Sequence, residues 1–123
     1  MSFKTDKSAN YTLIKFSTDK LDAIVAPDLK AELVLVSKEG AKNILVDLES
    51  VRYCDSSGLS ALLTGHRLCK EANGSFILSS LQPAVEKLIS ISQLDSILNI
   101  KATAKEAIDS AFVDQIERNL GTE

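Results

Sequence analysis

Apolar positions in this chain fall into two patterns, short continuous runs and longer stretches with helical spacing. Two β-prone runs near the start, residues 3–7 and 11–16, are separated by three polar or small residues and predict a β-hairpin. The second run carries apolar residues on both faces, so we expect it to lie inside a sheet. Two further apolar runs bounded by turn residues, 44–48 and 76–78, predict buried strands.

The stretches with an apolar period of about 3.6 residues predict helices. The first begins near Pro27, because the first turn of a helix does not need the N–H that proline lacks, and it ends at Gly40. The second covers residues 57–72 and the third begins at Pro83. The residues expected to face the core from the first helix are Leu29, Leu33 and Val36, with Val34 and Leu35 widening the stripe.

A last helix is predicted after Thr103, because a threonine followed three residues later by Glu106 forms a capping box. A short strand over residues 97–100 precedes it, which gives the order ββαβαβα(β)α. Strands that alternate with helices indicate the α/β class, with a mixed, mostly parallel β-sheet that begins in a hairpin. We expect one domain over residues 1–123, with its core in about 3–111 and the last helix reaching about residue 118.

Composition narrows the possible partners of this fold. The formal net charge is −3 and the pI is about 5.2, so nucleic acid held by its phosphates is not expected. The chain has four Phe, two Tyr and no Trp, which leaves few platforms for stacking bases. No segment resembles a signal peptide or is apolar over a membrane-spanning length, so we expect a cytoplasmic protein without direct membrane insertion.

Catalytic, metal and cofactor sites find little support in the sequence. His66, the only histidine, lies ten residues after Ser56 on one predicted helix, roughly 13–15 Å along its axis, too far to activate that hydroxyl. Cys54 and Cys69 lack the paired spacing of a zinc site and are expected to be free, buried thiols. No phosphate-binding glycine motif is present. We therefore expect no catalytic residue, no metal and no cofactor.

The most informative stretch is Cys54-Asp-Ser-Ser-Gly-Leu-Ser60, between a predicted strand and a predicted helix. Asp and Ser are the residues that cap helices, and a plain N-cap explains this stretch without any further role. The same position would also tolerate a phosphate on Ser56 or Ser57, because a helix N-terminus favours negative charge.

This stretch also carries a family resemblance. An apolar strand (44–48) followed by Asp55-Ser56-Ser57-Gly58-Leu59 resembles the STAS family of sulfate transporters and anti-sigma factor antagonists, in particular the small bacterial anti-anti-sigma factors. Supporting matches extend the resemblance over about residues 3–111, and they are Leu21, Asp22, Ala26, Leu29, Gly74, Pro83, Val85, Leu88 and Leu94. The family usually has Gly where this chain has Asp19, a residue that tolerates a left-handed turn better than most.

The resemblance implies a function. In that family the first serine after the Asp, here Ser56 (with Ser57 as the alternative), is phosphorylated by an anti-sigma factor that is itself a serine kinase. The unmodified antagonist binds this kinase and frees the sigma factor, the phosphorylated form does not bind, and a serine phosphatase resets it. The protein would then be a substrate and not an enzyme. The implied partner-binding residues are Asp22, Asp55, Ser56, Ser57, Gly58 and Leu59.

A second function is also compatible with the family. Some single-domain STAS proteins resemble constitutive accessory subunits of membrane transport ATPase complexes, which need no phosphorylation. A single phosphate on the protein from its own host would favour the antagonist.

Overall fold

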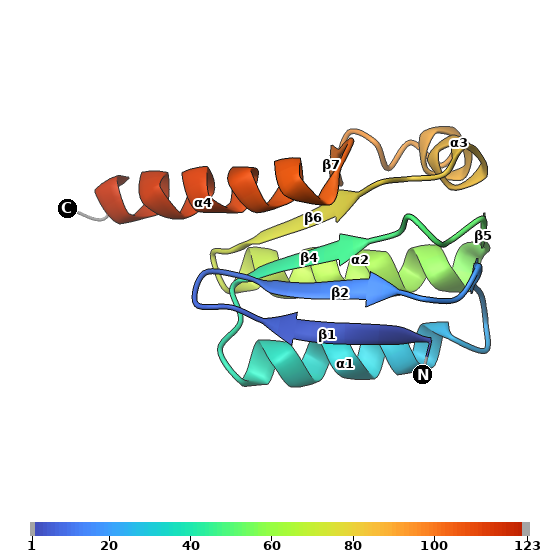
Figure 1. Ribbon diagram of the computed structural model, residues 1–123, viewed down its shortest axis with the longest axis horizontal. Helices are drawn as coiled ribbons and strands as arrows, with labels where there is room; N and C mark the ends of the chain where they lie inside the picture. Colours follow the sequence, from blue (N-terminus) through green and yellow to red (C-terminus); the bar gives the residue numbers. More distant parts are fainter. Residues whose placement is uncertain (1, 122–123) are drawn as a thin grey trace.

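The short apolar runs become strands and the periodic stretches become helices in the computed structural model, which describes residues 2–121 (Figure 1). In chain order the elements are β1 (Phe3–Lys7), β2 (Thr12–Phe16), β3 (Lys20–Leu21), α1 (Ala26–Lys38), β4 (Asn43–Asp47), β5 (Tyr53–Cys54), α2 (Ser56–Glu71), β6 (Ser75–Ser79), α3 (Pro83–Ile91), β7 (Asn99–Lys101) and α4 (Ala104–Gly121).

The main sheet has five strands in the order β1-β2-β4-β6-β7. β1 and β2 pair antiparallel as the predicted hairpin, and the other three pairings are parallel. β2 lies between β1 and β4, as its apolar residues on both faces predicted. The expected α/β class with a mixed, mostly parallel sheet is therefore confirmed.

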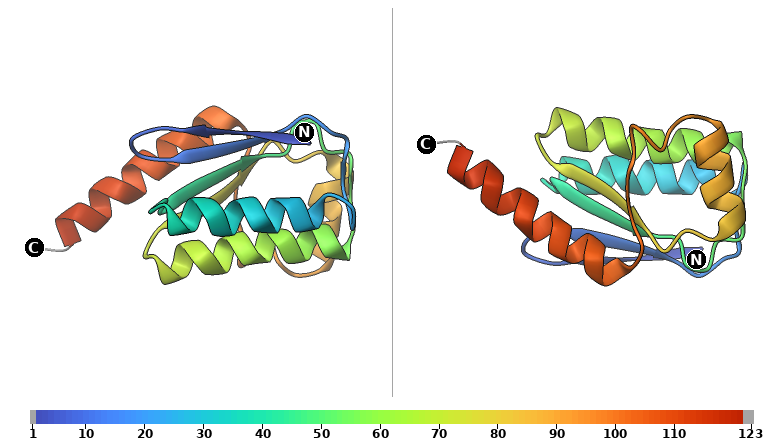
Figure 2. Two further views of the ribbon diagram at one scale, coloured as in Figure 1. Left: turned by 90° about the horizontal axis from the view of Figure 1, so that it is seen from below. Right: turned by 90° about the horizontal axis from the view of Figure 1, so that it is seen from above.

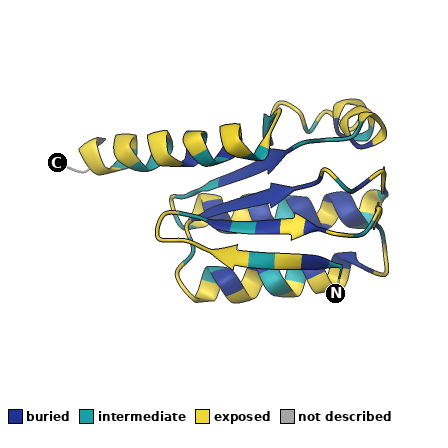
Figure 3. Ribbon diagram, in the orientation of Figure 1, coloured by how far each residue is buried: buried dark blue, intermediate teal, exposed yellow. Residues whose placement is uncertain are grey.

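The two faces of the sheet are covered by different helices (Figure 2). Side chains alternate along a strand, so Ile44 and Val46 of β4 face the larger core with α1 and α2, and Leu45 faces a smaller cluster beneath α4. The buried residues concentrate between these layers (Figure 3). β4 is buried at every position, which explains its continuous apolar run.

α1 buries a narrower stripe than its sequence predicted. Leu29, Leu33 and Val36 are buried, but Val34 and Leu35 are 36% and 51% exposed, so their assignment to the core was wrong. Both residues lie well over 100° around the helix from Leu29. Because α1 is at one edge of the helix layer and has α2 on one side only, this part of its surface meets no other element of the described chain (Figure 2). The predicted stop is confirmed at Gly40, where φ is +101° and glycine carries no Cβ penalty.

Two short strands and the end of α4 differ from the prediction. Lys20 was expected in a polar loop but belongs to β3, which pairs in parallel with β5 as a separate two-stranded sheet. Thr103 caps α4 as predicted, because its Oγ1 accepts a hydrogen bond from the backbone N–H of Glu106 at 3.1 Å. The helix then continues past Arg118 to Gly121, and Arg118 donates to Asn43 at the start of β4, which ties this last part of the helix to the sheet.

Candidate functional site

The two-stranded sheet of β3 and β5 brings the predicted site residues together. Lys20 pairs with Tyr53 and Leu21 pairs with Cys54, so Asp22 and Asp55 follow directly after two strands that lie side by side. The backbone N–H of Asp55 also donates to the carbonyl of Leu21 at 3.4 Å. Two segments distant in sequence therefore end at the same place, next to the starts of α1 and α2.

Both aspartates use their carboxylates to hold the turns that precede the helices. Asp55 is the N-cap of α2, and its Oδ1 accepts from the backbone N–H of Gly58 at 3.0 Å. Asp22 Oδ1 accepts from the N–H groups of Ile24 and Val25, at 3.1 and 3.2 Å. The N-cap expected in the Asp-Ser-Ser-Gly stretch is thus present, at Asp55, and Asp22 forms a comparable turn ahead of α1.

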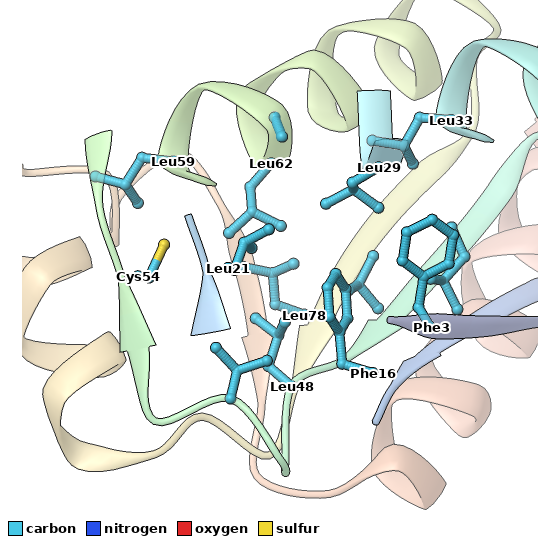
Figure 4. Packing of buried hydrophobic residues seen from close by; sticks show 14 of the residues in the cluster. Phe3, Phe16, Leu21, Leu29, Leu33, Leu48, Cys54, Leu59, Leu62 and Leu78 are labelled. Carbon is cyan, nitrogen blue, oxygen red and sulfur yellow. The ribbon is translucent and has the colours of Figure 1, made fainter. Parts of the chain in front are cut away.

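Gly58 fixes how closely α2 approaches β3 and β5. A Cβ on this glycine would lie 2.4 Å from the carbonyl oxygen of Leu21 and 2.7 Å from Cys54 Sγ. Leu59, beside it, is 8% exposed and packs into the core with Leu21, Cys54 and Leu62 (Figure 4). Gly58 and Leu59 are buried, so in the free chain they shape the site from beneath.

The hydroxyl groups at the start of α2 differ in accessibility. Ser56 is exposed, and Ser57 is half-buried. Together with Ser60 and Lys30 they line a shallow hollow of about 300 Å³, which Ala26 and Pro27 of α1 also line. The hollow exists because α1 and α2 lie side by side and begin at the same end of the sheet (Figure 2).

Lys30, which lines this hollow, was not singled out in the sequence analysis. No local signal connects Lys30 with Ser56, because their proximity depends on how α1 and α2 pack. The only hint was its position about one turn after Pro27, near the start of a helix that follows a predicted site residue, Asp22.

Comparisons with known proteins place this geometry in a family. The profile of the STAS domain matches residues 3–107, which include both segments of the site. The chain belongs to the STAS domain family. The resemblance inferred from the Asp-Ser-Ser-Gly-Leu stretch is therefore confirmed.

Named relatives of this STAS domain are regulators. The anti-sigma-B factor antagonist of Bacillus subtilis is 28% identical over 109 residues, which cover 88% of this chain and 99% of the relative. An anti-sigma-factor antagonist (STAS) domain protein from Planctomyces limnophilus has the same fold, with a TM-score of 0.81, 22% identity, and coverage of 89% of this chain and 97% of that one. The phosphorylated form of the Bacillus cell fate determinant SpoIIAA superposes with a TM-score of 0.70 and 25% identity, covering 88% and 97% of the two chains.

The loop before Asp22 has Asp19 at the position where the family resemblance implies a glycine. A left-handed conformation at Asp19, which aspartate tolerates, is not used: among the described residues positive φ outside glycine occurs only at Asn73, Ser80 and Gln93. The carbonyl of Asp19 instead accepts hydrogen bonds from the backbone N–H groups of Arg52 and Tyr53, at 2.8 and 3.1 Å. These bonds continue the pairing of β3 with β5, so the turn does not require glycine.

Other candidate chemistry in this STAS domain stays apart from Ser56. His66 lines a different hollow, with Lys70 and Arg118. Across residues 2–121, no three His, Cys, Asp or Glu side chains lie together as a metal site would require. Over the same residues, no helix has both the length and the apolar character needed to cross a bilayer.

We expect both thiols to be unreactive in the folded STAS domain. Burial, reinforced by the charge of Asp55, raises the pKa of the Cys54 thiol to about 12, and burial raises the pKa of Cys69 to about 12 against a smaller lowering by a backbone hydrogen bond at Ile44. At pH 8, Ellman's reagent should label the native protein roughly a hundredfold or more slowly than the urea-unfolded protein, because little thiolate is present. Rapid labelling of the native protein would contradict this.

The same pKa shifts predict a loss of stability in alkali. A thiol that stays neutral in the folded state and ionises in the unfolded state stabilises the fold fully below the unfolded pKa, near 9. This contribution is lost as the pH rises from about 9 towards 12. Urea unfolding followed at pH 8 and pH 10 should therefore give a lower midpoint at pH 10, and a Cys69→Ala variant should show a smaller drop.

Proposed function

We propose that this STAS domain is an anti-sigma factor antagonist that binds a serine-kinase anti-sigma factor through the surface around the start of α2. We further propose that phosphorylation of Ser56 abolishes this binding and that a serine phosphatase restores it. The observation that carries the proposal is the accessibility of Ser56, an exposed hydroxyl beside two aspartates that are both engaged in holding the backbone. Two Bacillus relatives support it, one named as an anti-sigma-B factor antagonist and one solved in a phosphorylated form.

A phosphate on Ser56 is compatible with the fold. Ser56 is the first residue of α2, and negative charge near a helix N-terminus stabilises the helix by about 0.3–1 kcal/mol. The Ser56 side chain is exposed, so a kinase can reach it without local unfolding. Ser57 is half-buried, which favours Ser56 as the phosphorylated residue.

The proposed partner surface combines polar and apolar groups. Asp22, Asp55, Ser56 and Ser57 supply its polar part, and Gly58 and Leu59 support it from below. Ile24 and Tyr53, which are 82% and 52% exposed, lie two residues from Asp22 and Asp55 along the chain. Exposed aliphatic and aromatic side chains of this kind anchor protein interfaces. In this proposal the protein is the substrate of a cytoplasmic kinase and not an enzyme.

Phosphosite mapping tests this function. The protein should be incubated with ATP and each candidate serine-kinase anti-sigma factor from its own genome, and the intact mass should then be measured. We expect one phosphate, mapped to Ser56, that is absent in a Ser56→Ala variant and retained in a Ser57→Ala control.

Two outcomes would contradict the proposal. One is the absence of modification by every candidate kinase. The other is an unmodified protein, isolated from its own host, that co-purifies with a membrane transport ATPase, which would favour an accessory subunit.

A further inference from the structure

We propose that Lys30 binds the phosphate of phosphorylated Ser56, so that the hollow between α1 and α2 is a binding site for this phosphate. This inference rests on the proposed function for its biological setting, because that function supplies the phosphate. It assigns a role to a residue of α1 that lies outside the Asp-Ser-Ser-Gly-Leu stretch.

The placement of the two residues carries the first part of the argument. α1 and α2 lie side by side and start at the same end of the sheet (Figure 2). Ser56 is the first residue of α2, and Lys30 lies about one turn inside α1. Both line the same hollow of about 300 Å³, together with the hydroxyl-bearing residues Ser57 and Ser60. A phosphate on Ser56 would therefore extend towards groups that donate hydrogen bonds.

The charges around the hollow carry the second part. Asp22 and Asp55 place two carboxylates at this end of the molecule, and a phosphate adds about −1.5 to −2 more. Among the residues that the structure describes, Lys30 is the one cation that lines the hollow. The cations closest in sequence to Asp22 and Asp55 are Lys20 of β3 and Arg52 before β5, which are exposed and do not line the hollow.

Lys30 is also available for a new partner. Its side chain is half-buried against the helix pair, yet within residues 2–121 it makes no hydrogen bond or ion pair. An unmodified domain thus keeps an unpaired ammonium group on the wall of the hollow that Ser56 borders. Phosphorylation would supply the missing anion, and the pairing would offset repulsion between the phosphate and the two aspartates.

The pKa for the second ionisation of the phosphate reports on this pairing. A nearby ammonium group favours the dianion and lowers the second pKa of phosphoserine, which is about 6 without such a neighbour. Phosphoserine should be installed at position 56 of the full chain by genetic code expansion, which removes the need for any kinase. A ³¹P NMR titration then gives this pKa, and we expect it to rise by about 0.5 in a Lys30→Gln variant.

The control uses a lysine of the same helix. Lys38, exposed in the last turn of α1, does not line the hollow, so Lys38→Gln should leave the phosphate pKa unchanged, and Lys30→Arg should preserve the wild-type value. Should Lys30→Gln fail to fold, the side-chain ammonium shift of Lys30 in the unmutated phosphoprotein provides the measurement, since it should follow the phosphate titration. Equal pKa values in all variants, or an ammonium shift that ignores the phosphate, would overturn the inference.

These results are separable from those on the proposed function. If the phosphate pKa does not depend on Lys30 but the phosphoprotein no longer binds its anti-sigma factor, the proposed role of Lys30 is wrong and the proposed function is still supported. If the phosphate pKa does depend on Lys30 but the protein binds the anti-sigma factor equally well with and without phosphate, the proposed function is wrong and the role of Lys30 is still supported.

Discussion

Replacing Ser56 with Asp is expected to weaken binding of the anti-sigma factor at least tenfold. The Ser56 side chain is exposed next to Asp22 and Asp55, so a new carboxylate would enter the proposed interface where negative charge already accumulates. An interfacial charge that no group of the docking protein matches costs about 2–5 kcal/mol, and 1.4 kcal/mol corresponds to a factor of ten in affinity. The cost to the fold is small, because the first turn of α2 favours negative charge.

Isothermal titration calorimetry with the anti-sigma factor measures this effect. Ser8→Asp is the matched control, since Ser8 is exposed in the hairpin turn at the opposite end of the sheet from the site (Figure 1), and its affinity should equal that of the wild type. Ser56→Ala should bind with full affinity, and ATP should not reverse its binding. Wild-type affinity for Ser56→Asp would rule out the charge-based switch.

Replacing Gly58 with Ala is expected to lower the free energy of unfolding by about 2–3 kcal/mol. The added methyl group would lie 2.4 Å from the carbonyl oxygen of Leu21 and 2.7 Å from Cys54 Sγ. The first of these neighbours is backbone, held in the pairing of β3 with β5, so it cannot move aside as a flexible side chain could. The higher helix propensity of alanine, about 1 kcal/mol, offsets only part of the clash.

Urea unfolding followed by circular dichroism gives the comparison. Ser60→Ala serves as the control, because Ser60 is exposed in the same helix and the substitution adds no atoms. Its unfolding midpoint should stay close to that of the wild type, whereas the midpoint of Gly58→Ala should fall clearly. A Gly58→Ala protein as stable as the control would show that α2 moves away from β3 at little cost, contrary to the close packing described above.

The two substitutions test different properties of the same stretch. Ser56 contributes an accessible hydroxyl, and Gly58 contributes the absence of a side chain. We therefore expect Ser56→Asp to change affinity with little change in stability, and Gly58→Ala to change stability first. Measuring both quantities on both variants separates a surface role from a packing role.

Patterns among residues close in sequence were sufficient to predict much of this fold. The continuous apolar run of β4 reflects burial on both faces of a central strand, and the hairpin follows from two β-prone runs with a short polar connection. The caps at Asp55 and Thr103 were predictable because each depends on a side chain and a backbone N–H three residues later. The family resemblance likewise rested on contiguous residues.

The sequence alone therefore determined the class of fold, the caps and the family, and it narrowed the proposed phosphorylation site to Ser56 or Ser57. Only the tertiary structure decided that Val34 and Leu35 face outward, that β3 pairs with β5, and that Lys30 shares a hollow with Ser56. The physical reason is the range of the interactions. A cap or a turn is satisfied within a few residues, whereas the width of a buried stripe and the neighbours of an exposed side chain depend on which helix packs alongside.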